Sequence, residues 1–325
     1  MSKEPRETVM ASKTFIRVAE VWVPDRERTL LEFGGGLYGG ARRFGAISRS
    51  LCFGRGEGLP GEAWERGRPV VLKQFEGANF RRTQAAAAEG LTCGIALPIF
   101  AGDLLTSVLV LFCGDDEAHA GAIEVWRNDP SDAAAAKDMV LDDGYYGTTA
   151  DAFEFISRRT SFRPGTGLPG LAWESGLPVF LPDLGKGGRF LRADGAQKVG
   201  INRGFAIPCS TFGPQVFVMA FLSALATPIV RRFESWLPGA DGGTLRLQEG
   251  FCERRGLLEG TTDRIERGQG VIGRAWTTCV PMVSELAQDE PGPVGTAARA
   301  AGLDAVLALP VLRQGRVSAV VTWYF

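Results

Sequence analysis

The sequence predicts an α+β protein made of three tandem copies of one unit, each an antiparallel sheet with helices packed on it. The main observation is a glycine motif that begins at Gly58, Gly167 and Gly270, with spacings of 109 and 103 residues. The first two copies read G-L-P-G-x-A-W-E-x-G-x-P-V, and the third reads G-V-I-G-R-A-W-T-T-C-V-P-M. Self-similarity at a nearly fixed period is the signature of repeated structural units.

Two further markers accompany the motif in the same order. Ahead of it stands a glutamate two residues before a tryptophan, at Glu20, Glu124 and Glu234. Behind it a glycine precedes a proline by 8 residues, in the pairs Gly90 and Pro98, Gly200 and Pro208, and Gly302 and Pro310. Three markers in three copies predict three domains, which we place at residues 14–117, 118–226 and 227–325.

Composition limits the classes of function. The 325 residues are 45% hydrophobic and 22% charged, as in a soluble globular protein. Because the chain has 36 basic and 37 acidic side chains, we do not expect its overall charge to attract nucleic acid or an anionic membrane. The polar N-terminus lacks a signal-peptide core, and no apolar run approaches a membrane span of roughly 20 residues. The six scattered cysteines form no C-x-x-C pair, so we expect a cytoplasmic protein with reduced thiols.

Each unit is expected to open with a β-hairpin. In the first unit, residues 14–23 alternate apolar and polar side chains as a half-buried strand does, residues 24–28 form a turn, and residues 29–33 return. Residues 34–40 are expected to be a glycine-rich connection that leads into an apolar segment at 50–53.

The motif itself is expected to begin a short helix, because Pro60 stands where a missing N–H costs least, and Gly67 ends that helix. Residues 69–72 form a brief strand. The alanine-rich residues 80–89 favour a second helix, which stops at Gly90. Strands at 94–100 and 105–112 close the unit. The connectors to the second and third units, at 114–121 and 224–230, are short, so the units should touch one another.

This order of elements resembles the GAF domain, on the strength of residues 58–70, residues 167–179 and the three glycine-to-proline segments. The resemblance covers nearly the whole chain. Residues 165–170 and 190–197 are most similar to GAF-like sensor regions of plant NIN-like regulators and bacterial signalling proteins. The resemblance implies a non-enzymatic sensory or regulatory protein of signal transduction, which binds a small molecule or a protein partner. It names no cofactor and no oligomeric state.

A GAF domain is expected to hold its ligand in a cavity between the sheet and the helices and loops above it. In the second unit, residues 181–192 would cover this cavity. We predict the ligand-binding residues to be Asp183, Arg189, Phe190, Arg192, Arg82 and Phe80. Guanidinium groups over a closed pocket favour an anionic ligand. The alternative is that each arginine pairs with a carboxylate, such as Asp183, and joins loop to helix.

The second unit keeps the full motif and the richest polar loop, which makes it the expected ligand unit. The third unit, with its altered motif, is expected to be a structural or contact domain. Trp64, Trp173 and Trp276 recur at one position of the helix and could line a pocket, but recurrence in all three units favours packing.

Several kinds of chemistry are disfavoured. No glycine motif has the form of a nucleotide P-loop. His119 is the only histidine, and we expect it in a connector, which limits zinc sites, bilin attachment and imidazole-assisted nucleophiles. We therefore expect no catalytic residues and no metal. Two alternatives remain: a thiol enzyme of the free methionine sulfoxide reductase type, in which two or three of Cys52, Cys93 and Cys113 converge, and a purely structural interaction scaffold with filled cores.

Overall fold

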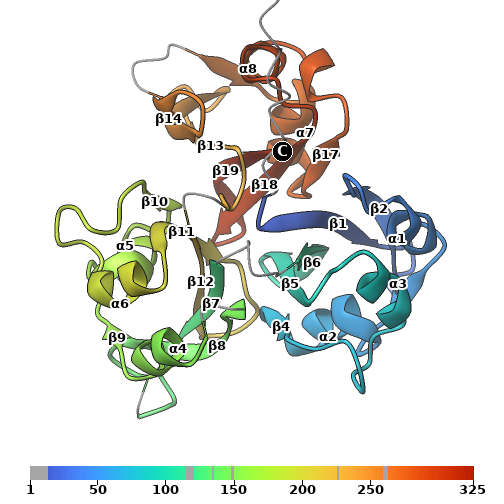
Figure 1. Cartoon of the computed structure of the whole chain (residues 1–325). Coiled ribbons are helices and arrows are strands. Elements are labelled where there is room, and N and C mark those ends of the chain that lie inside the picture. The colour runs from blue at the N-terminus through green and yellow to red at the C-terminus, as the bar shows by residue number, and fades with distance from the viewer. Residues whose placement is uncertain (1–13, 115–120, 134, 148–149, 225–226, 259–262) are drawn as a thin grey trace, which may run out of the picture.

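The computed structural model describes residues 14–114, 121–133, 135–147, 150–224, 227–258 and 263–325. It contains three antiparallel sheets, formed one after another along the chain, with helices on the outer face of each (Figure 1). The predicted fold class is confirmed: the protein is α+β and consists of three similar units, each an antiparallel sheet with helices packed on it. The leader and His119 lie outside the described residues. No helix in the described part is long and apolar enough to cross a membrane.

Unit 1 contains six strands and three helices, and its sheet has the strand order β3-β2-β1-β6-β5-β4. The elements are β1 (Ile16–Pro24), β2 (Leu30–Leu37), α1 (Arg42–Ser48), β3 (Cys52–Gly54), α2 (Gly58–Arg66), β4 (Val70–Leu72), α3 (Thr83–Ala88), β5 (Cys93–Ala101) and β6 (Leu104–Cys113).

Unit 2 repeats this plan with the strand order β9-β8-β7-β12-β11-β10. Its elements are β7 (Gly121–Asn128), β8 (Met139–Tyr145), α4 (Ala150–Arg158), β9 (Ser161–Phe162), α5 (Gly167–Ser175), β10 (Val179–Leu181), α6 (Ala193–Lys198), β11 (Ile201–Cys209) and β12 (Val216–Ala224).

Unit 3 has the order β15-β14-β13-β19-β18-β17, with β16 paired to β14. Its elements are β13 (Arg232–Pro238), β14 (Thr244–Cys252), β15 (Gly256–Leu257), β16 (Arg264–Glu266), α7 (Gly270–Thr278), β17 (Met282–Ser284), the 3₁₀ helix η2 (Ala287–Asp289), α8 (Pro293–Ala301), β18 (Val306–Arg313) and β19 (Arg316–Tyr324).

One part of the predicted unit was wrong. The expected glycine-rich connection at residues 34–40 is largely strand, because β2 continues to Leu37, and helix α1 was not predicted. The glycines make room for Tyr38. A Cβ on Gly36 would lie 2.8 Å from the Tyr38 ring, and one on Gly45 would lie 2.7 Å from it. Glycine is needed at these positions because the buried Tyr38 ring leaves no room for a Cβ, and not because the segment is a loop.

The recurring motif has a packing explanation. A Cβ on Gly61 would lie 2.0 Å from the carbonyl oxygen of Gly54, and the equivalent distances are 2.1 Å for Gly170 and 2.3 Å for Gly273. The motif helix therefore contacts the backbone of the segment before it without any side chain between them. At the other end, the residue that follows each motif helix is left-handed, with φ of 61° at Gly67, 65° at Gly176 and 57° at Cys279.

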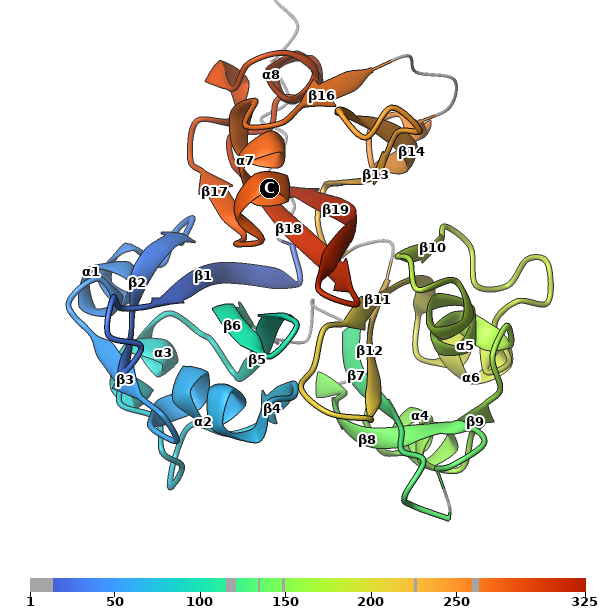
Figure 2. The ribbon, with the colours of Figure 1, turned by 180° about the vertical axis from the view of Figure 1, so that it is seen from behind.

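The inner faces of the three sheets meet and form one shared hydrophobic core (Figure 2). Leu109, Met219 and Val321 occupy the same register position of β6, β12 and β19, and all three are buried in this core. Each unit also has its own core between the sheet and its helices. A sheet buried on both faces explains the nearly continuous apolar runs of the final hairpins.

The flanks of the units contact one another in a cycle. Strand β4 of unit 1 contacts β8 of unit 2, and β17 of unit 3 contacts β2 of unit 1. Between units 2 and 3, Phe180 of β10 packs on Phe251 of β14, with ring centroids 5.3 Å apart. Repeated head-to-tail contacts of this kind close into a ring when the rotation between units permits it. The chain is thus a single-chain analogue of a cyclic trimer.

Hydrogen bonds to backbone carbonyls at the end of each motif helix reinforce the ring. The carbonyl of Gly67 in unit 1 accepts a bond of 3.3 Å from the Phe212 amide of unit 2. The Ser175 carbonyl of unit 2 accepts one of 3.2 Å from Arg313 of unit 3. The Cys279 carbonyl of unit 3 accepts one of 2.8 Å from the Thr106 hydroxyl of unit 1. Each helix end is therefore capped by the next unit.

The boundary between units 2 and 3 contains an uncompensated acid. At one position of β8, Asp143 forms an ion pair of 2.8 Å with Lys73 of unit 1. Glu249 has the equivalent position on β14, since it pairs with Ser235 as Asp143 pairs with Val125, but no charged group among the described residues contributes to its pKa shift. Burial raises the pKa of Glu249 from 4.5 to about 7.

We expect Glu249→Gln to stabilise the protein at neutral and alkaline pH. Between the unfolded pKa of 4.5 and the folded pKa of about 7, the folded state binds more protons, so the unfolding free energy falls as pH rises and then levels off. The substitution should remove this slope and add about 3 kcal/mol to the unfolding free energy above the folded pKa. Urea unfolding measured across this pH range tests it. A variant with the same slope as the wild type would contradict the assignment.

Candidate functional site

A buried glutamate stands near the start of every sheet. Glu20, Glu124 and Glu234 are at most 1% exposed. Each accepts a hydrogen bond from the indole Nε1 of the tryptophan two residues later, at 3.1, 3.0 and 3.0 Å. A buried carboxylate is costly unless a cation and hydrogen bonds compensate its charge. The partner of each glutamate therefore defines the centre of its unit.

In unit 1 the partner is Arg82. Its Nη1 donates to Glu20 Oε1 at 2.6 Å and to the Ser48 hydroxyl at 2.5 Å. The Tyr38 hydroxyl donates to the same carboxylate at 3.1 Å. Four aromatic rings surround the guanidinium at 4.4–5.9 Å, from Trp22, Phe44, Phe80 and Phe112. The Nη2 group is buried and has no hydrogen-bond partner among the described residues.

In unit 2 the partner is Arg192, which makes a fuller contact. Its Nη1 donates to Glu124 Oε1 at 2.5 Å, its Nη2 donates to Oε2 at 2.8 Å, and Nη1 also contacts the Ser157 hydroxyl. The Tyr146 hydroxyl donates to Glu124 at 3.0 Å. Rings of Trp126, Phe153, Phe162 and Phe190 lie 5.0–5.6 Å from the guanidinium carbon. This bidentate geometry is the strongest form of a carboxylate–arginine pair.

The pairing with Arg192 changes the pKa values of the acidic groups in the centre of unit 2. Burial alone would raise the pKa of Glu124, but the charge of Arg192 and the hydrogen bonds from Arg192, Ser157 and Trp126 outweigh it and hold the pKa below its usual range. Burial and the neighbouring Glu124 raise the pKa of Tyr146. The centre therefore holds a permanent ion pair and a neutral phenol at physiological pH.

Unit 3 supplies its cation from a different place. Arg232 lies two residues before Glu234 on β13 and donates to Glu234 Oε1 from Nε at 2.7 Å and from Nη2 at 2.6 Å. The helical position that holds arginine in the other units, 8 residues before the capping glycine, is the buried Val294. The hydroxyl groups of Thr322 and Tyr324 complete the set at 3.0 and 2.9 Å.

The structure divides the six predicted ligand residues into two groups. Arg82 with Phe80, and Arg192 with Phe190, lie in the buried centres of units 1 and 2. Asp183 and Arg189 lie in the loop outside. Asp183 accepts a bond from the Gly185 amide at 2.9 Å and pairs with Lys186 at 3.2 Å, and these contacts lower its pKa. Arg189 is exposed.

The alternative that the arginine pairs with a carboxylate is confirmed for Arg192, but the partner is Glu124 and not the suggested Asp183. Sequence reasoning missed the glutamates because they stand 62 and 68 residues from their arginines. The signal was available: a charged residue recurred inside an apolar strand, immediately before a recurring tryptophan.

Outside the centre of unit 1 lies an open cleft of about 450 Å³ between α1 and α3. Arg43, Ile47, Arg81 and Arg82 contribute to its lining, so its surface is basic. Arg81 also pairs with Glu57. In unit 2, the residue before the buried arginine is Leu191, which is 55% exposed, so the same place on the fold carries an apolar side chain instead.

The three cysteines of unit 1 separate into an exposed thiol and a buried pair. Cys93 and Cys113 occupy opposite register positions of β5 and β6 and face the core shared by the sheets, whereas Cys52 is exposed on β3. Burial raises the pKa of Cys209 to about 12 and also raises that of Cys279, which leaves little thiolate on either at neutral pH. No group of three metal-ligating side chains occurs in the part of the chain that the structure covers.

The three tryptophans of the motif helices all pack against the hydrophobic core of their own unit. Trp276 is 5% exposed, and Trp64 and Trp173 pack against the cores of their own units as partly buried side chains. All three stand at the same position of α2, α5 and α7. Their recurrence reflects helix packing at equivalent places.

No family model matches the chain, and no curated protein matches it. Among solved structures, a GAF domain of A. aeolicus nlh2 in an inactive state is 20% identical, with a TM-score of 0.26, and the match covers 31% of this chain and 60% of that one. A free methionine-R-sulfoxide reductase from Neisseria meningitidis in complex with its substrate is 16% identical, with a TM-score of 0.24, covering 30% and 52%. An NreA protein from Staphylococcus aureus, mutated in its nitrate binding site, is 16% identical, with a TM-score of 0.25, covering 31% and 74%. The first two matches thus span less than two thirds of those chains.

Proposed function

We propose that the protein is a non-enzymatic, cytoplasmic regulator that binds a small anion in the basic cleft of unit 1. The observation that carries this proposal is the unsatisfied Nη2 of Arg82, a buried donor beside a cleft of about 450 Å³. A buried donor without an acceptor costs about 1–3 kcal/mol, and more for a charged group. An anion that reaches Arg82 would remove that cost.

The surroundings favour an anion as the ligand. Arg43 and Arg81 line the same cleft and add positive potential, which concentrates negative ligands at its mouth. Because the Arg82 side chain is only 1% exposed, the ligand must displace part of the cleft wall to reach Nη2. The wall beside it is α3, a helix of only six residues whose sequence is largely alanine, so its displacement breaks few contacts. Movement of α3 on the outer surface would be the signal to a partner protein.

Unit 2 is the second candidate for the same chemistry. We propose Arg192 and Phe190 as its inner residues and Asp183 and Arg189 as the polar loop that would close over a ligand. Since Arg192 already donates both terminal nitrogens to Glu124, an anion there would have to compete with a bidentate pair. We therefore expect unit 1 to bind more tightly than unit 2.

Calorimetric titration with nitrate, phosphate and acetate tests this function. We expect at least one of these anions to bind the wild-type protein, and Arg43→Ala to weaken that binding about fivefold or more through the lost charge. Arg42→Ala is the matched control, because Arg42 is an exposed arginine of the same helix that does not line the cleft. Absence of binding by all three anions, or equal effects of the two variants, would refute the anion site.

A structural interaction scaffold is the competing function, and one observation favours it. The spaces between sheet and helices in units 1 and 2 are occupied by the arginine–glutamate pairs and their aromatic rings, as expected of filled cores. The thiol-enzyme alternative requires neighbouring cysteines. Of the three cysteines of unit 1, only the buried Cys93 and Cys113 lie opposite each other. Consumption of free methionine sulfoxide by the purified protein with a thiol reductant would revive it.

A further inference from the structure

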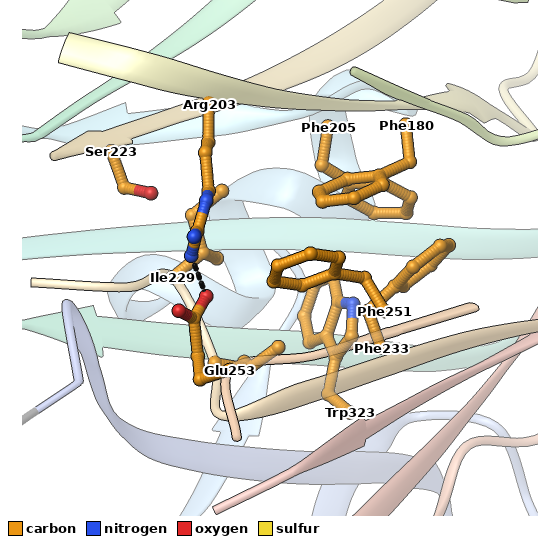
Figure 3. A pocket seen from close by; sticks show the side chains of 10 residues that line it. Phe180, Arg203, Phe205, Ser223, Ile229, Phe233, Phe251, Glu253 and Trp323 are labelled. Atoms are coloured by element: carbon orange, nitrogen blue, oxygen red, sulfur yellow. Dashed lines mark hydrogen bonds and ion pairs between the residues drawn. The ribbon is translucent and has the colours of Figure 1, made fainter. Parts of the chain in front are cut away.

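A small pocket lies at the boundary between units 2 and 3, and half of the residues that line it are aromatic (Figure 3). Phe180 and Phe205 come from unit 2, whereas Phe233, Phe251 and Trp323 come from unit 3. The cavity volume is about 20 Å³, which is room for about one water molecule. A larger guest must therefore move one of the rings.

The same boundary occurs three times in the ring, and only this one has aromatic side chains at all four of the equivalent positions given below. The equivalent positions follow from the strand registers. Between units 2 and 3 they hold Phe180, Phe205, Phe233 and Phe251; between units 1 and 2, Val71, Ile95, Ile123 and Tyr145; and between units 3 and 1, Val283, Leu307, Ala19 and Leu37. Two of the three boundaries are thus packed mainly with aliphatic side chains, so packing by itself does not require aromatic rings at these positions. The concentration of rings at the remaining boundary calls for a separate explanation.

A charged pair stands beside the rings. Arg203 of unit 2 forms an ion pair with Glu253 of unit 3, as the dashed line in Figure 3 marks, and its guanidinium carbon lies 4.5 Å from the ring centroid of Phe251. The Arg203 Nε is buried and has no hydrogen-bond partner in the described chain. At the equivalent register position unit 1 has Cys93, so the guanidinium is also particular to this boundary.

We propose that this boundary is a binding site for a small planar aromatic carboxylate. The aromatic ring would insert between Phe180 and Phe251, whose centroids are now 5.3 Å apart, and would stack on both. The carboxylate would accept hydrogen bonds from Arg203, including the free Nε, in place of Glu253. The ligand would thus supply the acceptor that Arg203 Nε lacks, and its ring would exchange the contact between Phe180 and Phe251 for one contact with each of them.

The entry route is through β10. This edge strand has only three residues, and Phe180 at its centre is half-buried, so its ring can swing outward without disrupting the central strands. The loop that follows β10 carries Asp183 and leads to Arg192. Ligand binding at the boundary would therefore shift this loop and change the contact between units 2 and 3. The site is independent of the anion cleft, which lies on unit 1.

Calorimetric titration with benzoate tests the proposal, with cyclohexanecarboxylate and benzylamine as controls for planarity and charge. We expect benzoate to bind, cyclohexanecarboxylate to bind more weakly, and benzylamine not to bind. Phe180→Val and Phe251→Leu introduce the residues of the boundary between units 3 and 1, so the boundary should remain packed, and each should weaken benzoate binding about tenfold. Arg203→Gln should weaken the binding of benzoate and of cyclohexanecarboxylate by the same factor. The ratio of the two affinities should therefore stay as in the wild-type protein.

Three results would overturn the proposal. They are a lack of benzoate binding to the wild-type protein, equal binding of benzoate and benzylamine, and benzoate affinity unchanged in both phenylalanine variants. Because Arg43→Ala leaves this boundary intact, benzoate binding that survives in Arg43→Ala but not in Phe180→Val would separate this site from the anion cleft.

Discussion

Glu124→Ala is expected to destabilise the protein by about 3–5 kcal/mol, because it leaves the Arg192 guanidinium buried without its counter-charge. The aromatic rings around Arg192 cannot replace the two lost hydrogen bonds. Urea unfolding followed by circular dichroism measures the loss. Glu154→Ala is the matched control, since Glu154 pairs with Arg158 on the surface of α4 in the same unit, where such pairs contribute about 0.5 kcal/mol.

A double variant distinguishes pairing from general damage. Replacing both Glu124 and Arg192 with leucine removes the two buried charges together, so it should cost less than Glu124→Ala alone. The pairing also predicts acid sensitivity. The pKa of Glu124 is lower in the folded state than its unfolded value, so its contribution is complete above that value and is lost as pH falls below it. Equal destabilisation by Glu124→Ala and Glu154→Ala would show that the buried pair does not hold unit 2 together.

Gly61→Ala is expected to cost about 3 kcal/mol or more, because its Cβ would lie 2.0 Å from the backbone carbonyl oxygen of Gly54. No rotation of a side chain can relieve this contact, so the motif helix must shift away from β3. Gly40→Ala is the control, since a Cβ there meets nothing within 4 Å. Thermal unfolding of the two variants gives the comparison. A Gly61→Ala protein as stable as Gly40→Ala would mean that the motif does not act through this close contact.

The fold class was predictable because its signals are local and repeated three times. Proline and glycine around Gly61, the alanine run of α3 and the alternating strands each specify an element within a few residues. Helix α1 was not predictable, because the neighbouring glycines looked like a loop, and their real role is to accommodate Tyr38. The environment of a glycine depends on a side chain that arrives from elsewhere in the fold.

The candidate sites were only partly predictable, because their partners are distant in sequence. The arginines at positions 82 and 192 stood out, but the carboxylates that bind them come from the first strand of each sheet. The boundary pocket could not be foreseen at all. Phe180 and Phe251 become neighbours only because the three units close into a ring, and nothing in the repeat reveals which flank meets which.

The claim that the three units pack around one core is tested most directly by small-angle X-ray scattering of the purified chain. A closed ring of 325 residues predicts a radius of gyration of about 20 Å, the value for a compact globule of this length. A radius of about 30 Å or more, with the elongated profile of units arranged in a row, would contradict it.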